Sequence, residues 1–115
     1  MKSLILCLTV LAVSTVAEPA ELTKLNATAC RNRADLDKYL FMVISNGECS
    51  SVRGAADSLC QDFRAEAAKI SGEKCIAANG SYPVVMRDKY NGRKILNVMQ
   101  ATISGKRYWV MDPVQ

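Results

Sequence analysis

The chain has 115 residues, of which half are apolar, and it has a formal net charge of +4 with no histidine. This length suits a single domain, and the apolar share is sufficient for a hydrophobic core. Because histidine is lacking, catalytic sites of the Ser/His/Asp and Cys/His types are excluded.

The first 17 residues predict a secretory signal peptide. Lys2 precedes an apolar run from Leu4 to Ala12, and Thr15 and Ala17 fit the small residues that precede a cleavage site. The run is too short to span a bilayer, and no later segment is suited to do so. We therefore expect a secreted, extracellular protein without a membrane anchor, whose mature chain begins at Glu18.

Residues 18–29 are polar and lack periodicity, so we expect a flexible arm before a single domain over residues 30–115. The triplets that begin at Asn26 and Asn79 match the acceptor sequence for N-linked glycans. Both asparagines are therefore candidate glycosylation sites if the source is a eukaryote. Asn79-Gly80 fits a plain turn equally well.

Residues 34–45 place Leu36, Tyr39, Leu40 and Val43 at helical spacing, and Asn46-Gly47 closes the segment. Its second half, residues 40–44, fits a buried strand equally well. The next segment predicts the longest helix, from Ser50 or Ser51 to Ile70, ended by Ser71-Gly72. Its apolar stripe consists of Val52, Ala55, Ala56, Leu59, Cys60, Phe63, Ala67 and Ile70.

Cys7 leaves with the signal peptide, so the mature chain keeps Cys30, Cys49, Cys60 and Cys75. An even number of cysteines in a small secreted domain predicts two disulfides, for which three pairings exist. A metal site is the alternative, but the chain has neither histidine nor a Cys-x-x-Cys pair. We expect no metal and no other cofactor.

The length of the predicted helix selects the pairing. A straight helix from Cys49 to Ile70 covers roughly 30 Å, and five extended residues return at most about 17 Å, so Cys49 does not reach Cys75. Cys49 and Cys60 are separated by most of three helical turns, whereas Cys60 and Cys75 can meet. The prediction is Cys30–Cys49 with Cys60–Cys75, and it fails if the helix is broken at Gly54.

After Cys75 the sequence predicts three strands, over residues 82–89, 94–103 and 106–111. Asn91-Gly92 and Ser104-Gly105 suit two-residue hairpin turns between them. The predicted fold class is α+β: one long helix packed on a three-stranded antiparallel β-meander, with a second, short N-terminal helix or strand and two disulfides.

These turns also set the pairs of opposed residues. The expected pairs are Arg87 with Leu96, Lys89 with Lys94, Thr102 with Arg107 and Gln100 with Trp109. One face then carries Val84, Met86, Ile95, Met99, Ala101, Ile103, Tyr108 and Val110, and we expect the long helix to pack on it.

The other face carries four cations and a tryptophan, namely Arg87, Lys89, Lys94, Arg107 and Trp109. A basic sheet face with an aromatic side chain favours phosphate-bearing or acidic partners. These five residues are the candidate binding site. The alternative is that the first helix covers Trp109, Leu96 and Val98, and that the cations only solvate the rim.

Ser81-Tyr82-Pro83 and Tyr90-Asn91-Gly92 follow the long helix within the predicted sheet. In these motifs residues 50–113 resemble the secreted fungal guanyl-specific ribonucleases and the ribonuclease-like effectors of plant-pathogenic fungi. The family has a histidine where this chain has Val84, and its catalytic glutamate has no counterpart in residues 108–111. The resemblance implies a ribonuclease-like shell without catalysis, so we expect no enzyme and no catalytic residue.

A long helix across an antiparallel meander also resembles cystatins, which block cysteine proteases with a hairpin loop. Residues 100–105 loosely match the Gln-x-Val-x-Gly loop and are one residue longer. A membrane-active toxin is a third candidate, although the chain has no strongly cationic amphipathic helix. We expect a monomeric, non-catalytic, effector-like protein that binds a host acidic protein or RNA, with protease inhibition as the second hypothesis.

Overall fold

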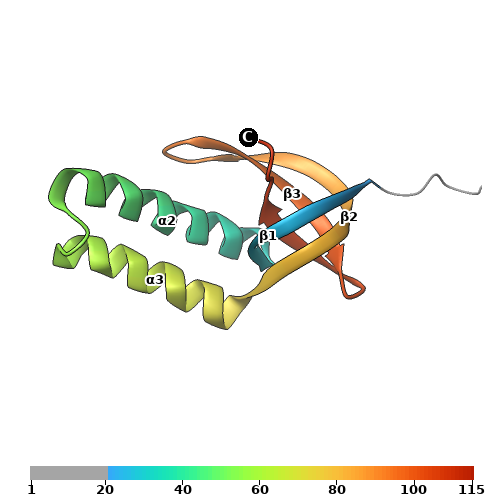
Figure 1. The fold of residues 1–115 in the computed structure, drawn as a ribbon, viewed down its shortest axis with the longest axis horizontal. Coiled ribbons are helices and arrows are strands. Elements are labelled where there is room, and N and C mark those ends of the chain that lie inside the picture. Colours follow the sequence, from blue (N-terminus) through green and yellow to red (C-terminus); the bar gives the residue numbers. More distant parts are fainter. Residues whose placement is uncertain (1–20) are drawn as a thin grey trace, which may run out of the picture.

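The computed structural model describes residues 21–115, so the predicted signal peptide and the start of the predicted arm lie outside the described residues. The fold is α+β, as predicted, with two helices and a four-stranded antiparallel sheet (Figure 1). The elements are β1 (Leu22–Cys30), α2 (Arg33–Arg53), α3 (Ser58–Lys74), β2 (Cys75–Asn91), β3 (Ile95–Ile103) and β4 (Lys106–Met111).

Strand β1 corrects the prediction of a flexible arm. Its residues pair with β2 over its whole length, from Leu22 opposite Pro83 to Cys30 opposite Cys75. Leu25 and Ala29 are fully buried, so the strand alternates between the core and the outside. Small alanines carry much of this alternation, and the apolar pattern is therefore weak in the sequence.

Helix α2 is longer than predicted and settles residues 40–44 as helical. It continues through Asn46-Gly47, which was expected to end it, and stops at Gly54. The φ of Gly54 is +94°, a conformation that favours glycine, and its N–H donates to the carbonyl of Ser50 at 3.0 Å. Helix α3 then begins under a cap in which Asp57 Oδ1 accepts from the N–H of Leu59 at 3.0 Å.

The break at Gly54 overturns the predicted disulfide pairing. The two helices fold back into an antiparallel hairpin, which brings Cys49 and Cys60 to a Cα–Cα distance of 5.4 Å and joins them. Cys30 and Cys75 lie opposite each other at the base of the hairpin and form the second disulfide. The helical hairpin is thus covalently closed at its tip and at its base.

The second β-hairpin confirms its predicted register, with Thr102 opposite Arg107 and Gln100 opposite Trp109. Its turn residues Ser104 and Gly105 have φ of 53° and 78°, as a two-residue turn with two positive φ angles requires.

The first β-hairpin has a different register from the one predicted. Residues 92–94 form a three-residue loop, so Lys89 lies opposite Asn97 and Arg87 opposite Met99. This register pairs Tyr90 with Leu96, and both side chains pack against α2. Burial of these two apolar groups favours the longer loop over the predicted two-residue turn.

The sheet curls into a closed barrel because β1 also pairs with β4, through Ala29 opposite Val110 and Cys30 opposite Trp109. One core cluster fills the barrel and consists of Leu25, Ala29, Ala78, Met99, Ala101, Ile103 and Val110. A second lies outside the barrel under α2 and consists of Cys30, Leu36, Leu40, Tyr90 and Val98. Of the predicted apolar face, all residues except the exposed Met86 and Ile95 therefore belong to or pack against the cluster inside the barrel, and α2 packs on the opposite face.

Candidate functional site

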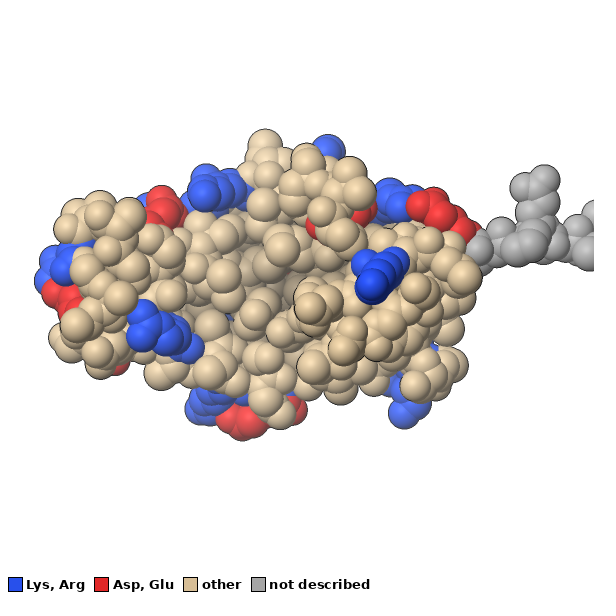
Figure 2. Space-filling model, in the orientation of Figure 1, with Lys and Arg blue, Asp and Glu red and all other residues tan. Residues whose placement is uncertain are grey.

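The five residues of the predicted binding face do not lie on one surface. The register of the first β-hairpin is offset by an odd number of residues from the prediction, which turns Arg87 and Lys89 toward the side of Met99 and the barrel interior. Arg107 and Trp109 lie on the outer face, and Lys94 lies in the loop before β3. Figure 2 shows Lys and Arg in scattered groups over one face of the molecule, separated by uncharged surface.

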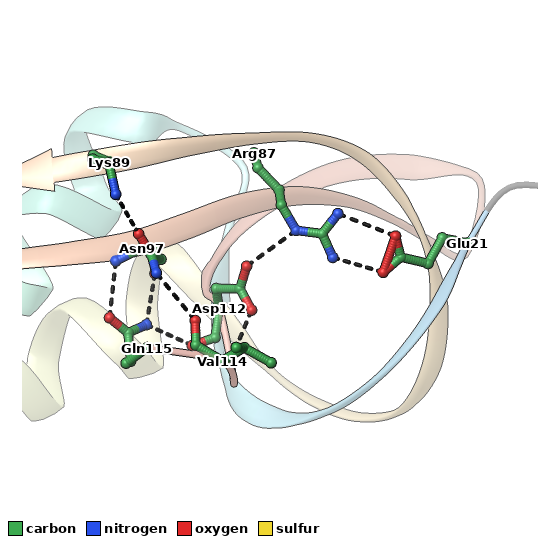
Figure 3. A network of polar contacts seen from close by, with 7 residues as sticks. All are labelled: Glu21, Arg87, Lys89, Asn97, Asp112, Val114 and Gln115. Atoms are coloured by element: carbon green, nitrogen blue, oxygen red, sulfur yellow. Dashed lines mark hydrogen bonds and ion pairs between the residues drawn. The ribbon is translucent and has the colours of Figure 1, made fainter.

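Arg87 is held by two carboxylates (Figure 3). Its Nη2 lies 2.7 Å from Glu21 Oε1, and its Nε lies 3.3 Å from Oδ2 of the buried Asp112. The hydrogen bond from Arg87 lowers the pKa of Glu21. This guanidinium therefore serves as an internal clamp between the start of β1 and the segment after β4.

Lys89 belongs to the same polar network (Figure 3). Its Nζ donates to Asn97 Oδ1 at 2.8 Å, and the amide side chain of Gln115 pairs with the backbone of Asn97 at 2.9 and 2.8 Å. The network lines an open cavity of about 460 Å³, at which two cations, Arg87 and Lys89, are balanced by two carboxylates, Asp88 and Asp112. Its main effect is to fasten residues 112–115 across the sheet.

Trp109 is half-buried beneath the start of α2. Arg33 stacks over its ring, with the guanidinium carbon 4.9 Å from the ring centroid, and also donates to Asp88 at 2.8 Å. This hydrogen bond lowers the pKa of Asp88. Trp109, Leu96 and Val98 all pack in the cluster under α2. The alternative in which the first helix covers these three side chains is confirmed.

A different site lies near the tip of the helical hairpin, and we call it the hairpin-tip pocket. It is a cavity of about 400 Å³ between α2, α3 and the loop that precedes β3. Its lining residues are Phe41, Ser45, Glu48, Cys49, Val52, Arg53, Leu59, Phe63 and Arg93. The Cys49–Cys60 disulfide joins its two helical walls, and the volume is in the range of ligand pockets.

The walls of the hairpin-tip pocket are apolar and open to solvent. Phe41 is 40% exposed, Leu59 is 46% exposed and Val52 is 85% exposed. Two ion pairs lie at the rim, Arg93 Nε to Glu48 Oε1 at 2.6 Å and Arg53 Nε to Asp57 Oδ2 at 3.2 Å. Apolar side chains gathered in this way at a surface mark an interaction site more often than isolated ones do.

Ser45 lies in the wall of this pocket, which also contains the charged residues Glu48, Arg53 and Arg93. The residue is 94% buried, with 6% exposed, and among residues 21–115 its Oγ has no hydrogen-bond partner. A buried hydroxyl without a partner costs roughly 1–3 kcal/mol. The pocket is therefore an open, largely apolar cavity with one unpaired hydroxyl buried in its wall.

The remaining predicted site residues lie elsewhere. Asn26 and Asn79 are exposed and directly opposite each other on β1 and β2, so they share one face of the sheet. The four cysteines are all in disulfides. Within the described residues no group of three His, Cys, Asp or Glu side chains is placed to hold a metal ion. Neither helix of residues 21–115 has the length and apolarity needed to cross a membrane.

Comparison with protein-family models, with curated proteins and with solved structures finds no match to this chain. The resemblances to guanyl-specific ribonucleases and to cystatins therefore stay predictions. The sequence analysis did not predict the hairpin-tip pocket. Phe41, Ser45 and Val52 recur at helical spacing and form one wall, but the second wall, on α3, comes into place only because the chain folds back at Gly54.

Proposed function

We propose that this is a secreted, non-catalytic, effector-like protein that binds a host protein through the hairpin-tip pocket. The partner inserts an apolar side chain that ends in a hydrogen-bonding group, such as that of tyrosine. The observation that carries the proposal is the open, largely apolar cavity, with the unpaired hydroxyl of Ser45 buried in its wall. A bound hydroxyl or carbonyl would supply the missing hydrogen bond.

The position of the pocket supports a protein partner. The helical hairpin projects away from the barrel, which leaves its far end free to enter a concave surface (Figure 1). The disulfide at this end fixes the two walls before binding, so less conformational entropy is lost on association. Aromatic anchors in pockets contribute a large share of the affinity of protein complexes.

The basic face has less support as the binding surface. Arg87 is engaged with Glu21 and Asp112, and Trp109 with Arg33 and the cluster under α2. An acidic protein or an RNA would meet the remaining cations on separate surfaces. Secretion rests on the predicted signal peptide, together with two disulfides, which are typical of oxidising compartments.

The cystatin-like hypothesis has one favourable feature, since Ser104 and Gly105, the last two residues of the predicted inhibitory loop, form an exposed tight turn. It is tested by titrating a papain-type cysteine protease with the purified protein. Stoichiometric inhibition would support it over binding through the hairpin-tip pocket.

Binding through the pocket is tested with immobilised protein and host extracellular fluid, using quantitative mass spectrometry of the retained proteins. Val52→Asp places a charge on the pocket rim at an exposed position, so it should leave the fold intact and lower retention of the partner at least tenfold. Val114→Asp is the matched control, because Val114 is 75% exposed and lies outside the pocket. Equal retention by both variants would refute the proposal.

A further inference from the structure

Strand β1 has an open edge. It forms nine residue pairs with β2 but only two with β4, at Ala29 and Cys30. In the described part of the chain, residues 22–28 therefore have no strand on the β4 side. Such an edge presents unpaired N–H and C=O groups to another strand.

The disulfide pair shows which backbone groups face this edge. The Cα atoms of Cys30 and Cys75 lie 4.2 Å apart, which is the spacing of a non-hydrogen-bonded pair in an antiparallel ladder. Because such pairs alternate along a strand, Lys24, Asn26 and Thr28 direct their N–H and C=O groups away from β2. Their position on the open edge is consistent with the pairing of Cys30 to Trp109 on the same side.

We propose that two copies of this protein associate by antiparallel pairing of their β1 edges, with the two-fold axis at Asn26. Asn26 then lies opposite the same residue of the second copy, and Lys24 lies opposite Thr28. The three pairs contribute about six backbone hydrogen bonds. The two barrels become one continuous sheet through the shared edge.

The charges of the edge fit this register. Lys24 is the one charged residue of β1 (Leu22–Cys30), and a two-fold axis at Asn26 keeps the two lysines apart instead of opposing them. Each lysine meets a threonine. A two-fold axis at Lys24 would bring two ammonium groups face to face and is disfavoured.

Open space on both sides of the edge leaves room for the side chains of an added strand. A cavity of about 470 Å³ lies toward α2 and is lined in part by Asn26, Thr28 and Tyr39. A second cavity, of about 320 Å³, is lined in part by Lys24, Leu25 and Pro113. Side chains of the second copy would alternate between these spaces, as they do along any strand.

The arrangement of the elements allows this pairing. The helical hairpin leaves the barrel at the Cys30 end of β1 and extends away from the Leu22 end (Figure 1). In an antiparallel dimer the two helical hairpins point in opposite directions. The contact is small, so we expect a dissociation constant in the micromolar range.

The test is sedimentation velocity of disulfide-bonded, bacterially produced protein from micromolar to near-millimolar concentration. The wild type should shift from monomer to dimer. Asn26→Pro removes the N–H at the two-fold axis without removing a hydrogen bond to β2, and it should weaken the dimer at least tenfold. Asn79→Pro makes the same change on the opposite edge of the β1–β2 ribbon and should leave the dimer unchanged.

A second measurement covers the outcome in which Asn26→Pro does not fold. An equimolar mixture of ordinary and ¹⁵N-labelled wild type is treated with an amine cross-linker, and Lys24–Lys24 peptides of mixed isotope composition are expected. The two lysines are about 14 Å apart along the paired strands. Two outcomes would overturn the proposal. One is a monomer at every concentration, as the sequence led us to expect, and the other is a dimer weakened only by Asn79→Pro.

Discussion

At the scale of single residues, Ser45 carries a hydroxyl that the described fold leaves without a partner. Serine is also a poorer helix former than alanine. We predict that Ser45→Ala raises the free energy of unfolding by about 1 kcal/mol, because it removes a buried unpaired group. The measurement is urea unfolding followed by circular dichroism.

The same substitution separates binding from folding. If the Ser45 hydroxyl forms a hydrogen bond with a bound partner, immobilised Ser45→Ala should retain less of that partner than the wild type does, although the variant is more stable. A destabilised Ser45→Ala variant would mean that the hydroxyl has a partner in the folded protein, and the argument from an unpaired group would then fail.

Trp109 is the second residue with a clear expectation. Its ring lies between Arg33 and the cluster under α2, so Trp109→Ala removes both packing and a cation–π contact. The ring is half-buried, and we expect the free energy of unfolding to fall by about 2 kcal/mol, less than for a fully buried tryptophan. A loss below about 0.5 kcal/mol, the range of ordinary surface substitutions, would place the ring on an exposed surface.

At the scale of elements, the helical hairpin depends on the Cys49–Cys60 disulfide. This bond closes a short loop, with a sequence separation of 11, and joins the walls of the hairpin-tip pocket. Replacing both cysteines by serine should lower the free energy of unfolding by about 3 kcal/mol. Hydrogen exchange should speed up first near residues 49–60, while amides of the barrel keep their relative protection.

Uniform acceleration of exchange along the whole chain would contradict this expectation. It would show that the disulfide supports the barrel as well as the tip. The Cys30–Cys75 bond provides the comparison, because it joins β1 to β2 at the base and has a sequence separation of 45. Its removal should affect both the hairpin and the barrel.

The elements also show where sequence reasoning succeeds. The turn at Ser104-Gly105 and the apolar alternation of β3 and β4 are local, and both gave the observed register. The prediction of two disulfides is confirmed, but the predicted pairing is wrong because it assumed a helix unbroken at Gly54. Val52 before Gly54 and the alanines Ala55 and Ala56 after it continue an apolar stripe, so the break has little local signal.

The predicted register of the first β-hairpin is wrong for a related reason. Asn91-Gly92 is a strong local signal for a two-residue turn, but tertiary packing of Tyr90 and Leu96 under α2 selects a longer loop. An odd offset of this register exchanges the faces of Arg87 and Lys89. This offset alone separates the residues of the predicted binding face. The hairpin-tip pocket could not be predicted because its two walls come together only when the chain folds back at Gly54.

At the scale of the whole molecule, a glycan on Asn26 would prevent the proposed self-association. Asn26 is exposed within an acceptor triplet and lies at the proposed two-fold axis. Cα atoms of a directly opposed, hydrogen-bonded pair are about 5.5 Å apart, which leaves no room for a glycan on each copy. A glycan on Asn79 lies on the neighbouring strand, away from the open edge, and is compatible with the dimer.

We therefore predict that protein secreted by a eukaryotic host is monomeric when Asn26 carries a glycan and dimeric after enzymatic removal of that glycan. Glycopeptide mass spectrometry identifies the occupied asparagine, and light scattering after size exclusion gives the mass. Asn79→Gln should leave the result unchanged, whereas Asn26→Gln should give a dimer without any enzyme treatment. A stable dimer with both copies glycosylated at Asn26 would rule out pairing through β1, since two glycans do not fit at one axis.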